Sequence, residues 1–528
     1  MILLPSTATV LLATKVAIPV YLVYLLGYAI YHRYFHRLRH FPGPFWASIT
    51  PLWYWQVVRY GKADQVHYPL HEKYGDIVRI TPNLLAVCNA QAIDTIYGPK
   101  NGKVWRKGNF YDGFDPHIAN ARTDGFSERN DAKNAERRRL ISSLYTQGSV
   151  LQYEPCVDRL IELFYQRMET FCKSQEPTDM SVWLKRYTFD VVGEIYYGRR
   201  GGFGMIRDDI DYNDWCLLMD LMPNYGASTT YFPYGLRTLY LMTQLFHSQG
   251  RKAVKGLLDV TKQAADAIND QWKVMTEGKE YPKNTMLTNM LEIVRDRGEK
   301  VSWTIADVQN EAWAVIWAGS DTTAIALSSI FYHLHKNPEK LKVLLQEIDG
   351  AFEEGRLSYP IRFSDARKLP YLHAVVMESM RVHPSLGTGL PREVPREGAD
   401  ICGTWVPGGV EVAMNSCSVH FDRRAFGADA DHWIPERWLR DGEEVAAKME
   451  RSMLQFGHGP RICIGRHITN IEMYKLLPTI LRDFKFDLLV EKWNVWEGWF
   501  HNTSNVMCKV SRRRPGEPKP ELVLEHMK

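Results

Sequence analysis

The sequence predicts a mainly α-helical protein with a small antiparallel β lobe and an N-terminal transmembrane helix. Helical periodicity dominates the chain, one clear hairpin pattern occurs at residues 76–89, and the chain opens on a long apolar run. No repeats or low-complexity tracts are present, and no long linker divides the body. We therefore expect an anchor with a basic flank at residues 1–40, one folded catalytic domain at 41–510 and a charged tail at 511–528.

The apolar run covers residues 16–31 without a charge, and Lys15 is the single charged residue in the first 31. Such a run approaches the ~20 apolar residues that span a bilayer, and Lys15 can snorkel toward the interface. A cleaved signal peptide would begin with basic residues, whereas here Arg33, Arg37 and Arg39 follow the run. We expect an uncleaved anchor with a cytosolic body, with a buried N-terminal helix as the alternative.

The body is expected to begin after Pro42-Gly43-Pro44, which interrupts a helix and forms a stiff spacer. Residues 76–89 predict two short strands around the turn residues Pro82 and Asn83. Periodicity punctuated by prolines predicts helices at residues 302–336, 338–349, 371–382 and 466–482.

Composition excludes some functions. A net charge of +4 spread over 528 residues does not indicate a nucleic-acid partner. The eight cysteines include no C-x-x-C pair that would indicate a disulfide or zinc framework. No phosphate-binding loop or dinucleotide-binding glycine motif is present, so any redox chemistry would need electrons from another protein.

Cys463 lies in FGHGPRICIG, residues 456–465. The thiol could pack in the core, bind a metal or act as a nucleophile. Glycines at 457, 459 and 465 suit a loop that closely approaches something flat. Arg461 and the N-terminus of the following helix both favour the thiolate.

The same stretch resembles the haem-binding loop of cytochrome P450, whose pattern is F-x-x-G-x-R-x-C-x-G. Phe456, Gly459, Arg461, Cys463 and Gly465 all match. The resemblance implies a haem b cofactor whose iron is axially ligated by Cys463. It also implies that Phe456 packs under the ring, Arg461 pairs with a propionate and Gly465 lets the next helix approach.

AGSDTT, residues 318–323, interrupts the pattern of the long predicted helix at 302–336. S-D-T-T is also a good helix N-cap signal, which is the structural alternative. The stretch matches the P450 pattern [AG]-G-x-[DE]-T-[TS]. The resemblance implies that Gly319 makes room for dioxygen and that Asp321 and Thr322 assist proton delivery.

Glu378 and Arg381 are three residues apart on a predicted helix and share one face. Alone, such a pair is most often a solvated ion pair of little energetic value. It matches the P450 motif E-x-x-R, which normally locks to a later arginine, here Arg437. The resemblance implies a structural trio that holds the loop carrying Cys463.

NAERRR, residues 134–139, resembles the P450 helix that reaches the haem propionates, with Arg138 in the arginine position. Asn134 stands where the family usually has an aromatic residue or histidine, which leaves one propionate contact open. Arg392 is a second propionate candidate by resemblance. An exposed basic face that docks an acidic electron donor is the alternative for the arginine run, and both can hold.

Three loops are candidates for substrate contacts: the aromatic stretch with Phe110, Tyr111 and Phe114, residues 385–390, and residues 496–502. These positions correspond to variable loops over the haem in the family. Ordinary surface or core packing is an equal alternative for each.

The resemblance implies a membrane-anchored haem-thiolate monooxygenase that inserts one atom of O2 into a lipophilic small molecule. Electrons would come from NADPH by way of NADPH-cytochrome P450 reductase, at the endoplasmic reticulum membrane, with a single-pass anchor and a cytosolic body. The sequence is similar to filamentous-fungal members of secondary metabolism, including those like pisatin demethylase. The alternatives are a haem-thiolate isomerase or peroxygenase that uses neither O2 nor a reductase, and a non-catalytic haem-binding protein.

Overall fold

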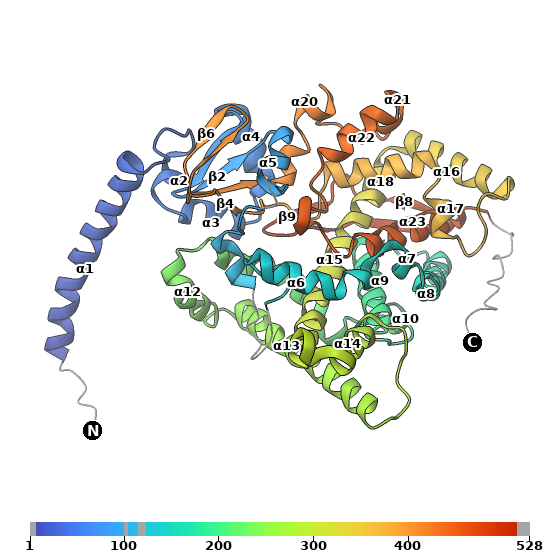
Figure 1. Cartoon of the computed structure of the whole chain (residues 1–528). Helices are drawn as coiled ribbons and strands as arrows, with labels where there is room; N and C mark the ends of the chain where they lie inside the picture. The colour runs from blue at the N-terminus through green and yellow to red at the C-terminus, as the bar shows by residue number, and fades with distance from the viewer. Residues whose placement is uncertain (1–6, 100–103, 115–122, 515–528) are drawn as a thin grey trace.

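The computed structural model describes residues 7–99, 104–114 and 123–514, and helices dominate them (Figure 1). The longer helices are α1 (Thr7–Ile30), α3 (Leu52–Arg59), α4 (Ala63–Tyr74), α6 (Asp131–Ile141), α8 (Glu154–Ser174), α9 (Met180–Ile195), α11 (Trp215–Tyr225), α12 (Arg237–Gln244), α13 (Ser248–Thr276), α14 (Met286–Val301), α15 (Ile305–Lys336), α16 (Pro338–Glu353), α18 (Pro370–Val382), α22 (Glu443–Arg451) and α23 (Arg466–Asp483). The four helices predicted from the sequence are all present, as α15, α16, α18 and α23.

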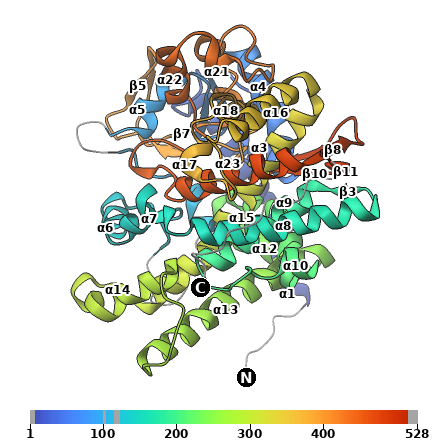
Figure 2. The ribbon, with the colours of Figure 1, turned by 90° about the vertical axis from the view of Figure 1, so that its right-hand side faces the viewer.

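Short helices connect these elements. They are α2 (Phe45–Ile49), α5 (Ile93–Tyr97), α7 (Gln147–Leu151), α10 (Met205–Asp208), α17 (Phe363–Ala366), α19 (Ser416–Val419), α20 (Arg423–Phe426) and α21 (Arg437–Arg440). Figure 2 shows α13 and α14 at one end of the molecule and α21 and α22 at the opposite end, with α15 between them.

Helix α15 runs through the middle of the molecule (Figure 1). Thr304 caps its N-terminus in a capping box with Asp307, which satisfies backbone N–H groups at the start of the helix. The helix packs most extensively against α9, and also against α13 and α18. A Cβ atom at Gly319 would lie 2.9 Å from Val192 Cγ2, so this glycine permits the close approach of α15 to α9.

The predicted interruption of this helix at residues 318–323 is wrong, because α15 is continuous through it. The Thr322 hydroxyl donates a 2.8 Å hydrogen bond to the Ala318 carbonyl one turn earlier, so the polar side chain is satisfied without breaking the helix. By length and hydropathy α15 would suffice to cross a bilayer, but 72% of its apolar window is buried in the protein. That burial is typical of a core helix.

The strands form small sheets: β1 (Ile77–Thr81), β2 (Leu84–Val87), β3 (Thr178–Asp179), β4 (Arg392–Glu393), β5 (Ala399–Ile401), β6 (Thr404–Val406), β7 (Glu411–Met414), β8 (Phe484–Leu488), β9 (Asn494–Glu497), β10 (His501–Ser504) and β11 (Met507–Arg512). The predicted hairpin is confirmed as the antiparallel pair β1 and β2. The largest sheet has the order β1-β2-β7-β4, and β2 pairs with β7 in parallel. The lobe is therefore mixed and not purely antiparallel, because the chain reaches β7 by a long crossover through the helical body.

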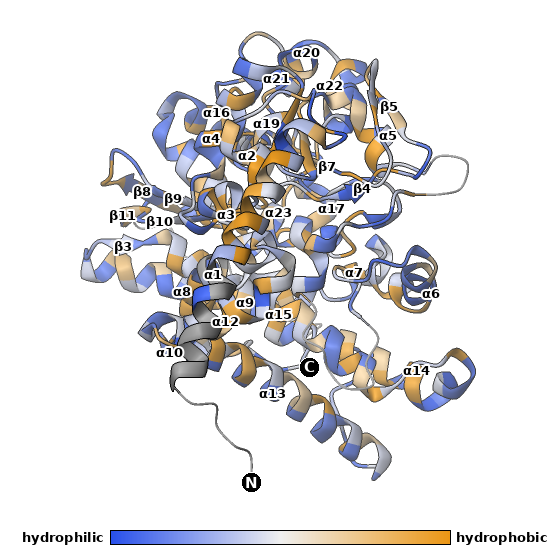
Figure 3. Ribbon diagram, turned by 90° about the vertical axis from the view of Figure 1, so that its left-hand side faces the viewer, coloured by the Kyte–Doolittle hydropathy of each residue, from blue (hydrophilic) through white to orange (hydrophobic). Residues whose placement is uncertain are grey.

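Helix α1 extends away from the folded body (Figure 1). Its described part carries exposed apolar side chains from Val20 to Ile30, among which Val23 is 70% exposed. In Figure 3 the hydrophobic colouring of α1 lies along the part of the helix near α2. The helix therefore leaves apolar area in contact with solvent that packing against the protein does not remove.

The folded chain continues past residue 511, where the charged tail was expected to begin. Strand β11 pairs with β8 as far as Arg512. Arg513 Nη1 lies 2.9 Å from Asp349 Oδ1 on α16. Residues 515–528, the rest of the predicted tail, lie outside the described residues.

Candidate active site

Cys463 lies in a tight loop between a 3-10 turn at Gly459–Arg461 and helix α23. The Cys463 backbone N–H donates a 2.7 Å hydrogen bond to the Phe456 carbonyl and closes the loop. Gly457 and Gly459 have φ of 71° and 65°, a region that favours glycine. A Cβ atom at Gly459 would collide with the Tyr97 carbonyl, so α5 packs directly on the loop.

Cys463 is exposed to solvent. Burial raises the pKa of this thiol, while hydrogen bonds from the Gly465 and Arg466 N–H groups and the charge of Arg138 oppose that rise. The two N–H groups belong to the start of α23, as the sequence predicted. Arg461, the other expected source of positive charge, instead forms a 2.6 Å ion pair with Asp131 of α6.

Four cationic side chains gather around this loop: Lys107, Arg138, Arg392 and Arg461. Arg138 donates a hydrogen bond to the Ile462 carbonyl, which ties α6 to the loop. Lys107 and Arg392 form an isolated β-bridge and are both buried. Burial, with the charges of Arg392, Arg461 and Arg138, holds the pKa of Lys107 well below its usual range.

A cavity beside the loop is lined by two of these cations. Its lining comprises Tyr97, Leu386, Thr388, Leu390, Arg392, Met414, Ser416, Leu454, Gly457, His458 and Arg461. Residues 385–390, predicted to line the substrate site, contribute three of these side chains.

These residues fit a flat group that carries negative charge. Arg461 Nη1 is buried without a hydrogen-bond partner among the described residues, and the buried Lys107 Nζ, which donates to the Phe126 carbonyl, also lies near the charges of Arg392, Arg461 and Arg138. Both observations point to an anion as the missing partner. A Cβ atom at Gly457 would have its nearest neighbour at 3.9 Å. A Cβ atom at Gly465 would have no neighbour within 4 Å among the described residues. The predicted reason for Gly465, close approach of the next helix, is therefore not found, and both glycines leave room for a ring beside Cys463.

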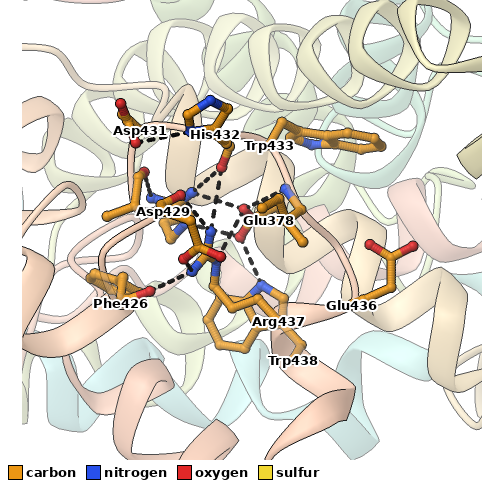
Figure 4. Close-up of polar contacts among 12 residues, drawn as sticks. Glu378, Phe426, Asp429, Asp431, His432, Trp433, Glu436, Arg437 and Trp438 are labelled. Atoms are coloured by element: carbon orange, nitrogen blue, oxygen red, sulfur yellow. Dashed lines mark hydrogen bonds and ion pairs between the residues drawn. The ribbon is translucent and has the colours of Figure 1, made fainter.

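Glu378, Arg381 and Arg437 form the predicted trio, and none of the three side chains is exposed. Arg381 donates two hydrogen bonds of 2.8 and 2.9 Å to Glu378, and Arg437 Nε lies 3.2 Å from the same carboxylate. The Trp438 indole and the Ile434 N–H complete the acceptor positions of Glu378 (Figure 4). The geometry is confirmed, and it joins α18 to the segment that contains α21.

Asp321 on α15 is fully buried and faces Lys185 of α9, whose Nζ lies 3.3 Å from Asp321 Oδ1. Lys185 also contacts Asp220 of α11 at 2.6 Å. Burial raises the pKa of Asp321, Asp220 strengthens that rise, and Lys185 opposes it. The sequence motif indicated Asp321 but not Lys185. The Asp321–Lys185 ion pair joins two helices that are far apart in the chain, so no local pattern reveals it.

The acid–hydroxyl segment lies beside the helix that follows the cysteine loop. Thr323, next to Thr322, forms a 3.1 Å hydrogen bond with Thr469 in the first turns of α23. The Thr322 carbonyl accepts a 2.6 Å hydrogen bond from Ser385 Oγ, in the segment that leads to the cavity wall. The acid–hydroxyl segment is therefore in contact with the helix that follows the cysteine loop, 146 residues further along the chain.

Helix α6 does not present only an exposed basic face, because some of its polar residues are buried. Asn134 is buried, and its Oδ1 has no partner among the described residues. Arg137 is also buried and pairs with Glu311 of α15. Arg138 was predicted from the sequence and Arg137 was not, although the two are adjacent on the helix.

The aromatic loops predicted to contact substrate converge with one another. The Phe110 and Phe114 rings lie 4.9 and 5.0 Å from the Trp499 ring, and Phe126 joins them. Phe110 is buried, so much of this cluster packs internally. Residues 115–117 of the same loop lie outside the described residues.

The profile of the cytochrome P450 family matches residues 40–506. The chain belongs to the cytochrome P450 family. It is 34% identical over 494 residues to cytochrome P450 monooxygenase gsfF of Penicillium aethiopicum, which covers 93% of this chain and 96% of that protein. It is 32% identical over 476 residues to pisatin demethylase of Fusarium vanettenii, with 89% and 88% covered.

Among solved structures, a crystal structure of a cytochrome P450 (CYP102L1) matches with a TM-score of 0.67 at 18% identity, covering 85% of this chain and 94% of that one. This likeness supports the P450 fold. The chain is accordingly a cytochrome P450 monooxygenase, an oxidoreductase that uses haem. In P450s the haem iron is held by a cysteine thiolate.

Lys107 is the functional candidate that sequence reasoning missed most clearly. It lies in the loop that was considered only for its aromatic residues. Its charge has no sequence signal of its own, since its significance depends on the bridge to Arg392 and on the cations around it.

Proposed function

We propose that this P450 is anchored in the endoplasmic reticulum membrane and inserts one atom of O2 into a lipophilic small molecule of fungal secondary metabolism. Two electrons per turnover come from NADPH through a separate reductase. The observation that carries the proposal is the Thr323–Thr469 contact, which brings the Asp321–Thr322 pair beside the helix that follows Cys463. An acid and a hydroxyl next to the cysteine loop are what oxygen activation requires of the polypeptide.

Cys463 is proposed as the axial ligand, and the cations around it hold the propionates. Arg461 has the strongest need for an anion, since its Nη1 is buried without a partner among the described residues, and the buried Lys107 adds a basic group close to it. Arg392 and Arg138 add positive charge, and Phe456 closes the loop by accepting from the Cys463 N–H. When bound, haem supplies oxygen activation, to which the thiolate contributes by favouring O–O cleavage.

Asp321 and Thr322 supply protons. Because burial raises the pKa of Asp321, this carboxyl retains a proton at a pH where an exposed aspartate has lost it. The Lys185 ammonium keeps that pKa from rising further and holds the carboxyl in place. Asp321 passes its proton to the Thr322 hydroxyl, which gives up its own proton on the cysteine side, and Gly319 permits the close approach of α15 to α9, the helix that carries Lys185.

The anchor is supported by the exposed apolar residues of α1 and by the basic residues Arg33, Arg37 and Arg39 that follow it. Basic residues after an apolar helix favour the cytosolic side. A chain with residues 1–40 deleted is expected to move from the membrane fraction to the soluble fraction after carbonate extraction. If it remains in the membrane fraction, α1 is not the anchor.

The thiolate assignment is tested by the ferrous carbon-monoxide spectrum. The wild-type protein and a Cys402→Ser control, which alters an exposed thiol, are expected to give the red-shifted Soret band of P450s. Cys463→His is expected to retain haem and lose that band. Persistence of the band in Cys463→His would overturn the assignment.

The reaction class is tested with purified protein, reductase, NADPH and 18O2, with extracts of the host as the source of substrate. A product that gains one 18O atom only when NADPH and reductase are present supports the proposal. Product without reductase indicates an isomerase or peroxygenase, and no turnover with any extract indicates a haem-binding protein without catalytic activity; either result would contradict it.

A further inference from the structure

Three buried side chains converge at a point outside the cysteine loop. They are Cys417 on α19, Glu497 at the end of β9 and His501 at the start of β10. One potential ligand atom of each lies within 4.8 Å of the other two. Exposure is 5% for Cys417, 0% for Glu497 and 5% for His501. Cys417 is not part of the motif that contains Cys463.

The carboxyl group of Glu497 is the part of this cluster that lacks a cationic partner among the described residues. Neither carboxylate oxygen has a hydrogen-bond partner with normal geometry among the described residues, although the side chain is fully buried. The Cys417 thiol is the polar group that faces it, and Asp64 adds negative charge nearby. A buried carboxylate without a partner is costly, so it must gain either a proton or a cation.

The backbone fixes the position of this carboxyl group. A Cβ atom at Gly387 would collide with the Glu497 side chain, so residues 386–388 pack directly on it. The Glu497 N–H also donates a 3.3 Å hydrogen bond to the Gly61 carbonyl. The carboxyl group therefore cannot swing out to solvent without moving two neighbouring segments.

The distances match a tetrahedral metal ion. Zinc binds thiolate sulfur at about 2.3 Å and histidine nitrogen at about 2.0–2.1 Å, which places the two ligand atoms about 3.6 Å apart at a tetrahedral angle. Cys417 Sγ lies 3.6 Å from His501 Nδ1. The Pro384 carbonyl oxygen lies 3.2 Å from the same nitrogen and accepts a hydrogen bond from it when Nδ1 carries the proton, so a metal at Nδ1 would replace that proton.

The charges of the neighbouring groups also suit a cation. Burial, together with His383 stacked on its ring, holds the pKa of His501 well below its usual range, so the imidazole is neutral and able to bind a metal. Burial and the Glu497 charge raise the pKa of the Cys417 thiol, so the thiol gives up its proton only when a cation replaces it. Sulfur, nitrogen and carboxylate oxygen together form a ligand set that zinc accepts.

We propose that Cys417, Glu497 and His501 bind one Zn2+ ion that is separate from the haem iron. This site braces the wall of the cavity. Leu386 and Thr388 line the cavity while Gly387 between them packs on Glu497, and Cys417 directly follows the cavity residue Ser416. The proposal does not depend on the monooxygenase activity.

Full-length holoprotein, purified without a metal-binding tag after growth with added zinc, tests the site. Elemental analysis is expected to find about one zinc per chain beside the iron. Zinc-edge X-ray absorption is expected to show one sulfur at about 2.3 Å and nitrogen or oxygen at about 2.0 Å. Because this measurement is specific to zinc, the haem iron does not interfere, and no variant needs to fold.

Cys417→Ala and Glu497→Gln are expected to lower the zinc content below about one tenth per chain while the carbon-monoxide spectrum stays unchanged. Cys508→Ala, which alters another buried thiol, is the matched control and should retain zinc. Wild-type protein without stoichiometric zinc, or zinc without a sulfur neighbour, would overturn the proposal. So would Glu497→Gln with full zinc content, because the carboxyl group would then be protonated and not a ligand.

Discussion

Replacing Glu378 by glutamine tests whether a buried charge network positions the cysteine loop. Glu378 accepts hydrogen bonds from Arg381 at 2.8 and 2.9 Å, from Arg437 at 3.2 Å, from Trp438 at 3.0 Å and from the Ile434 N–H at 2.8 Å. Glutamine has nearly the same shape, so no cavity forms. The change removes one negative charge and turns one acceptor into a donor.

The expected loss of folding stability depends on which groups lose a partner in Glu378→Gln. Arg437 retains Asp429 at 2.5 Å, but the carboxylate of Glu378 is the anion paired with Arg381, which otherwise meets backbone carbonyls. Losing one charged hydrogen bond costs about 1.5–3 kcal/mol, and breaking a fully buried ion pair costs about 3–5 kcal/mol. Because neither the Glu378 nor the Arg381 side chain is exposed, we expect the loss of about 3–5 kcal/mol that is typical of a broken buried ion pair.

Urea unfolding followed by circular dichroism, together with the ratio of haem to protein, measures the effect. Glu378→Gln is expected to unfold at lower urea and to be purified with little haem. Glu436→Gln is the matched control on the same segment, since Glu436 is 37% exposed and its pair with Lys340 contributes at most about 1 kcal/mol. If both variants behave like the wild-type protein, the network does not position the loop.

Three further variants test the site. Thr322→Ala is expected to form less product per NADPH consumed, while Thr322→Ser, which keeps the hydroxyl, stays coupled; equal coupling would exclude the assigned role. Lys185→Met removes the charge that opposes the raised pKa of Asp321, so coupled turnover should persist to higher pH, and a pH profile unchanged from wild type would contradict this. Lys107→Met is expected to lower the haem content at least about tenfold if Lys107 holds a propionate, whereas Lys133→Met on the exposed face of α6 should not.

The helices were predictable because their signals are local. Periodicity and proline punctuation located α15, α16, α18 and α23, and the turn residues Pro82 and Asn83 located the β1–β2 hairpin. The parallel pairing of β2 with β7 was not predictable, since it depends on where a long crossover returns. The continuity of α15 was missed because a Gly-Ser-Asp-Thr stretch favours a helix end locally, while packing against α9 overrides that preference.

The site residues also divide into those that a local motif predicts and those that only long-range contacts reveal. The trio of Glu378, Arg381 and Arg437 followed from a motif and is confirmed in its geometry. Lys107 and Lys185 have no motif, and each gains its role from a partner on another element. Charged pairs between distant segments leave no spacing signal, so a single sequence cannot show them.

The buried charged groups at these sites differ in whether the chain itself supplies a partner of opposite charge. Glu378 and Asp321 each meet a cation supplied by the chain. Arg461 pairs with Asp131 but leaves Nη1 without a partner, and neither oxygen of Glu497 meets a cation among the described residues. Since an unpaired buried charge is costly, each group must gain a partner from outside the chain or, for the carboxyl group, a proton. The cations around Cys463 are thereby assigned an anion and Glu497 a metal ion, and each assignment can fail without the other.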